Sequence, residues 1–176
     1  WNFWTHKKVE KISSPFSAVV TPQYQTLIDY WSGNGSQPSS AYAEAALISF
    51  ANSLKLENCI SRPGVLASLT DPDFGEISKP YSDHSIPGII PAAEYDIGAW
   101  GLSYTDSDYY NNGDGNYNDG WSFRNDGVDI EASSEDDEIP YTVGWTDAGE
   151  WLGYTIQNVT PGTYDLKIKI AAPASG

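Results

Sequence analysis

The residues best suited to chemistry lie between Asp119 and Glu131, in the sequence D-G-W-S-F-R-N-D-G-V-D-I-E. Trp121 and Phe123 flank a serine, and Arg124, the only arginine of the second half of the chain, follows them. If this segment is extended, Trp121, Phe123 and Asn125 share one face, because alternate side chains of a strand project to the same side. A flat ring covers the apolar face of a sugar while neighbouring amides and hydroxyls meet its hydroxyl groups. The alternative is a strand whose aromatic side chains belong to the core.

An acidic loop before this stretch suggests a calcium site. Asp114, Asn116 and Asn118 fit positions 1, 3 and 5 of an EF-hand loop. Asp119 stands where that loop requires glycine, and Asn125 stands where it requires a glutamate. We therefore interpret the loop as solvated and predict no metal ligands from it.

Glu150, between Gly149 and Trp151, is a candidate catalytic carboxylate. Glycosidases use two carboxylates on either side of the scissile bond. No second carboxylate can be paired with Glu150 from the sequence. We therefore predict no catalytic residue in this chain.

Charge and composition restrict the partners. The 176 residues carry a formal charge of -15, and residues 86–176 hold 16 acidic and 3 basic side chains. Such a field repels nucleic acids and anionic membranes but leaves neutral polysaccharides unaffected. Cys59 is the only cysteine, so an internal disulfide is excluded. With no apolar span and no signal peptide, the sequence predicts a monomeric internal piece of a longer, secreted protein.

The first part of the chain predicts a strand and two helices. Residues 1–5 form an aromatic strand candidate. A helix opens at Thr21-Pro22, with threonine as N-cap, and closes at Gly33. A second helix is expected from about Ala41 to Glu57. The proline-rich residues 61–87 predict a covering loop and a linker.

The second part predicts short strands with no helices between them. Residues 141–145 and 151–156 are strand candidates. Residues 163–170 alternate between apolar and polar side chains, which is typical of a half-buried antiparallel strand. Several such strands in succession predict a β-sandwich.

The first segment resembles the C-terminal end of a glycoside hydrolase family 5 catalytic domain. The resemblance rests on W-N-F-W-T-H-K-K at 1–8, the helix at 24–31, Pro38-Ser39 and K-L-E-N-C at 55–59. It implies the eighth strand and outer helices of a (β/α)8 barrel. Trp4 matches the tryptophan that stacks under the sugar beside the scissile bond. The catalytic glutamates of that family lie on earlier strands.

The second segment resembles carbohydrate-binding module family 6, a jelly-roll sandwich of galactose-binding-like fold. The resemblance rests on I-P-G-I-I-P-A-A-E-Y-D at 86–96, F-R-N-D-G-V-D-I-E at 123–131, V-G-W-T-D-A-G-E-W-L at 143–152 and T-P-G-T-Y-D-L-K-I-K-I at 160–170. It implies a sugar cleft in which Phe123 takes the place of the usual tyrosine. The cleft's partner tryptophan and asparagine would lie beyond Gly176.

The resemblance also bears on metal binding. The family often carries Glu-Ala-Glu on its first strand, where the carboxylates bind a structural calcium. Here Pro91, Ala92 and Ala93 stand at those positions, followed by Glu94. Two hard oxygen ligands are replaced, so no cofactor is firmly expected and the structural calcium is left in question.

Together these features predict a mixed fold with two incomplete domains. Residues 1–70 form the end of a (β/α)8 barrel, 71–85 a linker, and 86–176 a truncated β-sandwich. The expected function is polysaccharide binding, through Phe123 and Trp121, within a secreted glycoside hydrolase that acts on a neutral β-glucan-type polymer. Without the catalytic glutamates the chain itself is expected to be inactive. The alternative is a stand-alone lectin or adhesion domain with no enzyme.

Overall fold

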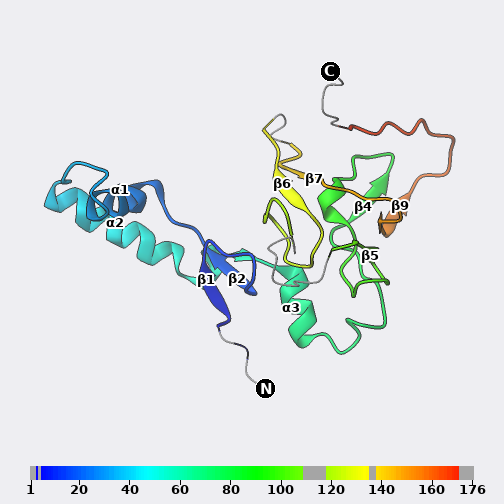
Figure 1. Ribbon diagram of the computed structural model, residues 1–176, viewed down its shortest axis with the longest axis horizontal. Helices are drawn as coiled ribbons and strands as arrows, with labels where there is room; N and C mark the ends of the chain where they lie inside the picture. The colour runs from blue at the N-terminus through cyan, green and yellow to red at the C-terminus, as the bar shows by residue number, and fades with distance from the viewer. Residues whose placement is uncertain (1–2, 4, 109–117, 135–137, 171–176) are drawn as a thin grey trace.

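The computed structural model describes residues 3, 5–108, 118–134 and 138–170. A pair of helices lies at one end, a small sheet in the middle, and a β-rich part at the other end (Figure 1). The helices are α1 (Pro22–Trp31), α2 (Ser40–Ser53) and α3 (Pro63–Thr70). The strands are β1 (Lys7–Val9), β2 (Phe16–Ala18), β3 (Ile60–Ser61), β4 (His84–Ile86), β5 (Tyr104–Thr105), β6 (Ile130–Ala132), β7 (Tyr141–Val143), β8 (Trp151–Leu152) and β9 (Ile156–Val159). Among the described residues, no helix is long and apolar enough to cross a membrane.

The predicted boundaries of α1 are confirmed. The Thr21 hydroxyl accepts a hydrogen bond from the backbone N–H of Tyr24, and Pro22 occupies the first turn. Gly33 follows the helix with a φ of 78°, a left-handed conformation that glycine adopts at little cost.

α1 and α2 pack against each other through a narrow apolar seam. The rings of Tyr24 and Phe50 stack with their centroids 4.0 Å apart, and Leu27 and Ala46 are fully buried beside them. Leu47 of α2 remains about half exposed. The second helix is shorter than expected, because a 3-10 turn at Leu56–Asn58 follows α2.

The predicted loop after residue 60 is wrong in its first part. Residues 63–70 form α3, with Pro63 in the first turn and Asp71 as C-cap before Pro72. Proline tolerates the first helical position because its missing N–H has no intrahelical partner there. The prolines that suggested a loop therefore mark the two ends of a short helix.

The first strand lies later than predicted. Trp1, Asn2 and Trp4 lie outside the described residues, and neither Phe3 nor Thr5 belongs to a strand. The chain instead forms β1 at Lys7–Val9, which pairs in parallel with β2, and β2 pairs antiparallel with β3. This three-stranded sheet lies in the segment that was predicted to be the end of a barrel. It does not establish a (β/α)8 barrel.

The β-rich part consists of three two-stranded sheets, β4–β9, β5–β8 and β6–β7, within the described residues. The expected strand at 151–156 is divided into β8 and β9, and the expected strand at 141–145 stops at Val143. Their core is a cluster of five buried residues, Ala93, Tyr95, Tyr104, Val128 and Ile130. The fold of the described residues is thus partly β, as predicted, but a jelly roll is not established.

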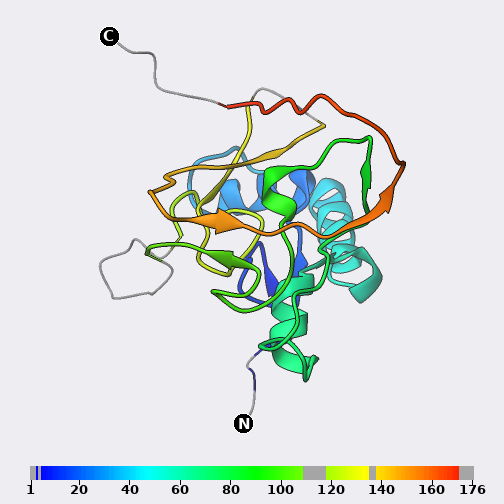
Figure 2. The ribbon, with the colours of Figure 1, turned by 90° about the vertical axis from the view of Figure 1, so that its right-hand side faces the viewer.

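The alternating segment at residues 163–170 does not form the half-buried strand that its pattern predicts. It runs free of the sheets in both views (Figures 1 and 2). The apolar side chains of Leu166, Ile168 and Ile170 are 86%, 70% and 78% exposed. The alternating pattern predicts one buried apolar face. Among the described residues, no strand pairs with this segment and its apolar side chains stay exposed.

This difference in burial predicts unequal effects of substitution. Ile130→Ala should lower the free energy of unfolding by about 2–5 kcal/mol, because it removes a fully buried side chain and leaves a cavity. Ile168→Ala should change it by less than about 0.5 kcal/mol, because the side chain is already in water. Urea denaturation followed by tryptophan fluorescence measures both. A comparable loss for Ile168→Ala would show that residues 163–170 are packed in solution.

Candidate functional site

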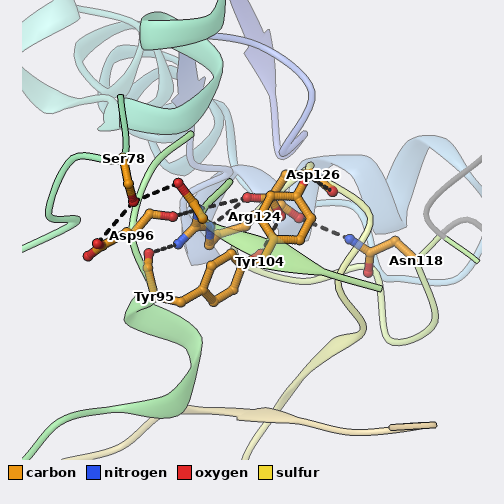
Figure 3. Close-up of polar contacts among 8 residues, drawn as sticks. Ser78, Tyr95, Asp96, Tyr104, Asn118, Arg124 and Asp126 are labelled. Carbon is orange, nitrogen blue, oxygen red and sulfur yellow. Dashed lines mark hydrogen bonds and ion pairs between the residues drawn. The ribbon is translucent and has the colours of Figure 1, made fainter. Parts of the chain in front are cut away.

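The centre of the site region is a buried arginine. Arg124 is 6% exposed, and its guanidinium carbon lies 3.6 Å from the centroid of the Tyr95 ring (Figure 3). Its Nη2 and Nε lie 2.7 Å and 2.8 Å from Oδ2 of Asp126. Its Nη1 donates to the carbonyl of Tyr95, and Nη2 also donates to the carbonyl of Asp96 at 3.1 Å. These contacts occupy the guanidinium within the protein, so Arg124 holds the fold together.

Asp126 completes this buried network. Its Oδ1 accepts a hydrogen bond from the Tyr95 hydroxyl at 2.5 Å, and its carbonyl accepts one from the Tyr104 hydroxyl at 2.5 Å. Burial alone would lower the pKa of Arg124, but the charge of Asp126 and the tyrosines raise it above the ordinary value. Burial, reinforced by Asp126, raises the pKa of Tyr95 well above that of a free tyrosine. Arg124 is therefore held as a cation beside Asp126, and Tyr95 remains a neutral hydrogen-bond donor.

Phe123 is packed between aromatic neighbours. Its ring stacks on Tyr141, with centroids 4.5 Å apart and an interplanar angle of 24°, and lies 5.3 Å from the ring of Tyr81. It is partly buried against the β core. The Phe123 carbonyl accepts a hydrogen bond of 2.8 Å from Nη1 of Arg62, which immediately precedes α3. A residue from the first part of the chain thus fixes the backbone at the predicted platform.

Trp121 is 49% exposed and lies outside the core. The backbone is not extended here, because Trp121 and Phe123 have φ values of 44° and 63°. The same-face argument for Trp121, Phe123 and Asn125 therefore fails, since it requires a strand. The strand of this stretch begins only at Ile130. Trp4, the other predicted stacking residue, lies outside the described residues.

A groove of about 190 Å³ opens beside Phe123. α3 and the residue before it form one wall, through Arg62, Gly64 and Val65. The β-rich part forms the other, through Phe123 and Asn125. No motif in the sequence pointed to Arg62, because the proline-rich stretch around it predicted a covering loop.

Three acidic side chains gather on another side of the β-rich part. Carboxylate oxygens of Asp106, Asp108 and Asp129 lie within 4.8 Å of one another, and Asp106 and Asp129 are buried. Burial first, then hydrogen bonding with Asp108, raises the pKa of Asp106 to about 8. Burial, followed by repulsion from Asp108 and Asp119, raises the pKa of Asp129 to about 6 against the hydrogen bond that the Asp119 backbone donates.

Oxygen ligands at this spacing are the type that Ca²⁺ prefers, so these three residues could hold a divalent cation. The predicted EF-hand positions differ from this cluster. Asp114 and Asn116 lie outside the described residues, and Asn118 donates through Nδ2 to the Arg124 carbonyl at 3.1 Å. Asp129 was missed because it follows Asp106 by more than twenty residues, a separation that no short loop motif includes.

Glu94, left over from the family's calcium-binding pattern, is engaged within the protein. Its Oε2 accepts a hydrogen bond of 2.6 Å from the Ser82 hydroxyl. The buried Nε2 of His84 lies 4.0 Å from the same oxygen and 3.1 Å from the Glu94 carbonyl. These contacts give Glu94 a structural role in joining β4 to the turn at Ala92–Glu94.

Glu150 has the environment of a stable carboxylate. It accepts hydrogen bonds from the backbone N–H and hydroxyl of Ser107 and from the backbone N–H of Asp147. Burial acts to raise the pKa of Glu150, but these bonds outweigh it and hold the pKa below the ordinary value. A general acid of a glycosidase needs a raised pKa, so Glu150 is unsuited to that role.

The buried arginine generates a stability prediction. Arg124→Met should lower the free energy of unfolding by about 3–5 kcal/mol, because Asp126 then remains partly buried without its cation. Lys167→Met, at an exposed basic residue, is the matched control and should stay within about 0.5 kcal/mol of the parent. Urea denaturation measures both. A loss below about 1 kcal/mol for Arg124→Met would contradict the central role of this pair.

The acidic cluster generates a pH prediction. The pKa of Asp106 is about 8 in the folded chain, against an ordinary value of 3.8, so the folded state holds this proton more tightly. Stability should therefore fall as pH rises from about 4 to about 8. Asp106→Asn should flatten this decline and raise the Tm at pH 8, whereas the exposed Asp165→Asn should not. Thermal denaturation with a chelator present measures the effect, and a decline of the parent's size in Asp106→Asn would contradict it.

Comparison with known proteins found a similarity in the last part of the chain. Residues 124–176 match the family model of a carbohydrate binding module, family 35. No curated protein and no solved structure matches the chain. The match supports the prediction of a carbohydrate-binding module at this end, and it names family 35 where the sequence motifs resemble family 6. Carbohydrate is accordingly the class of partner that the findings support.

Proposed function

We propose that the chain binds a neutral polysaccharide and that it does so as part of a secreted glycoside hydrolase. The observation that carries the proposal is the match of residues 124–176 to a carbohydrate binding module. In such an enzyme the module raises the effective concentration of the catalytic domain at an insoluble polymer. The hydrolase parent itself rests on the resemblance of residues 1–70 to a family 5 barrel end.

Exposed aromatic side chains supply the surface that a sugar polymer needs. Trp121, Trp145 and Trp151 are 49%, 54% and 42% exposed on the β-rich part. Tryptophan rings contribute a large apolar face and a polar N–H, and both are useful against a sugar ring. Phe123, with Tyr141 against its ring, offers its remaining surface to the groove beside α3.

The charge of the chain favours an uncharged polymer. Residues 86–176 carry 16 acidic and only 3 basic side chains, which disfavours anionic partners. A neutral β-glycan, the substrate class that we propose, meets no such penalty. Glu150, the carboxylate that the sequence singles out, has a lowered pKa and is unsuited to act as a general acid, so we expect binding without turnover.

The apolar surface on the helix pair favours the hydrolase parent over a stand-alone lectin. Trp31, Leu47 and Ile48 are 60%, 48% and 56% exposed on α1 and α2. In a barrel enzyme the outer helices pack their apolar faces against the barrel strands. In a stand-alone lectin this apolar surface would remain exposed to solvent.

Affinity gel electrophoresis on β-glucan, xylan and agarose tests the binding function. The chain should be retarded by at least one of these polymers, and Trp121→Ala or Phe123→Ala should weaken binding about tenfold, since losing one aromatic contact costs about 1.5 kcal/mol or more. Trp31→Ala, an exposed tryptophan on α1, is the matched control and should bind like the parent.

The outcomes separate the roles of the two residues. Because Phe123 packs on Tyr141, its variant needs a near-UV circular dichroism spectrum like that of the parent before its binding is compared. No retardation of the parent chain by any of the three polymers would overturn the proposed function. Retardation unaffected by both Trp121→Ala and Phe123→Ala would place the binding surface elsewhere.

A further inference from the structure

We infer that the groove between α3 and the β-rich part is a subsite for one ring of a neutral sugar polymer, and that Arg62 completes it. This inference rests on the proposed function and goes beyond it, because it places part of the site outside the carbohydrate-binding module. The residues that carry it come from both parts of the chain.

The two walls of the groove are held together by a specific contact. Nη1 of Arg62 donates a hydrogen bond of 2.8 Å to the carbonyl of Phe123. On the α3 side Val65 and Leu69 line the groove, and on the other side Phe123 lines it. The groove therefore has apolar surface on both sides, which suits the C–H faces of a sugar ring.

Two polar atoms beside this groove have no hydrogen-bond partner within the described residues. They are Nε of Arg62 and Oδ1 of Asn125, and both are buried. A buried donor or acceptor without a partner costs about 1–3 kcal/mol. One of these atoms donates and the other accepts, and a hydroxyl group can do both. A sugar ring in the groove would bring hydroxyl groups that can serve as the missing partners.

The carboxylate at the groove already has a cationic partner, so it does not require a charged ligand. Asp126 lines the groove, but its carboxylate is paired with Arg124. The surrounding chain is strongly acidic, which disfavours an acidic sugar. A groove of about 190 Å³ accommodates a single ring, so one unit of the polymer would enter while its neighbours extend along the surface.

A glycine at the groove allows a direct test. Gly64 lies in the first turn of α3 and lines the groove, and a Cβ placed on it would meet no atom within 4 Å. Gly64→Leu therefore adds bulk at the groove on a Cβ that meets no neighbouring atom, and it replaces a helical glycine by a better helix former. Gly75→Leu is the matched control, because its Cβ also meets no atom within 4 Å and it does not line the groove.

The experiment measures the affinity of the whole chain for oligosaccharides prepared from β-glucan, xylan and agarose, by isothermal titration calorimetry. Gly64→Leu should weaken the binding of the preferred oligosaccharide at least about tenfold, and Gly75→Leu should leave it unchanged. Arg62→Met, which keeps the length of the side chain but removes its donors, should also weaken it. The Tm of each variant, compared with the parent, establishes that the fold is retained.

The failure of the inference can be told apart from the failure of the proposed function. If the parent chain binds an oligosaccharide and folded Gly64→Leu binds it equally well, the groove is not a subsite, although the chain still binds carbohydrate. If Trp121→Ala alone abolishes that binding, the site lies on the exposed aromatic surface. If the parent binds none of the three, both the proposed function and the subsite are overturned.

Discussion

The guanidinium of Arg124 lies under the ring of Tyr95, paired with Asp126 and bonded to the carbonyls of Tyr95 and Asp96. Burying a charged pair is costly unless every donor and acceptor is satisfied, and here the tyrosine hydroxyls and backbone carbonyls satisfy them. The pair connects the chain around residue 95 with the turn at 126, which precedes β6. The small β core of five buried residues depends on this connection, because its two-stranded sheets bury little surface individually.

The same network determines what the aromatic stretch can present. Because these contacts fix Arg124, they also fix the groove wall that it forms together with Phe123 and Asn125. The backbone reaches this arrangement through left-handed conformations at Trp121 and Phe123, which cost energy in residues that carry a Cβ. Gly120 passes so close to the Ile130 carbonyl that a Cβ there would clash. The stretch is therefore held by its contacts against its own conformational preferences, as is common where side chains are positioned for binding.

Local signals in the sequence were sufficient for α1, where a threonine cap, a proline and a closing glycine act within a few residues. They were insufficient wherever a partner distant in sequence decides the outcome. The alternation at residues 163–170 predicts a strand, but a strand needs a neighbour, and the described chain provides none. The prolines at the two ends of α3 led to the prediction of a loop in place of this helix. The cluster of Asp106, Asp108 and Asp129, and the contact from Arg62 to Phe123, depend on residues brought together only by the fold. The motif resemblance did predict a carbohydrate-binding module, because such motifs consist of residues that many members of one family share.

The contact between Arg62 and Phe123 also changes how the two parts of the chain relate. A linker that only tethers a module leaves the module's binding surface independent of the domain before it. Here the residue preceding α3 donates to the backbone of the predicted platform, and α3 lines the groove beside it. The free energy of sugar binding at this groove would then include the free energy of holding α3 against the module. A sugar bound in the groove would stabilise the contact between α3 and the module. The contact would make the free energy of sugar binding more favourable by the same amount, because such coupling is reciprocal. Sugar binding and the arrangement of the two parts are thus expected to depend on each other.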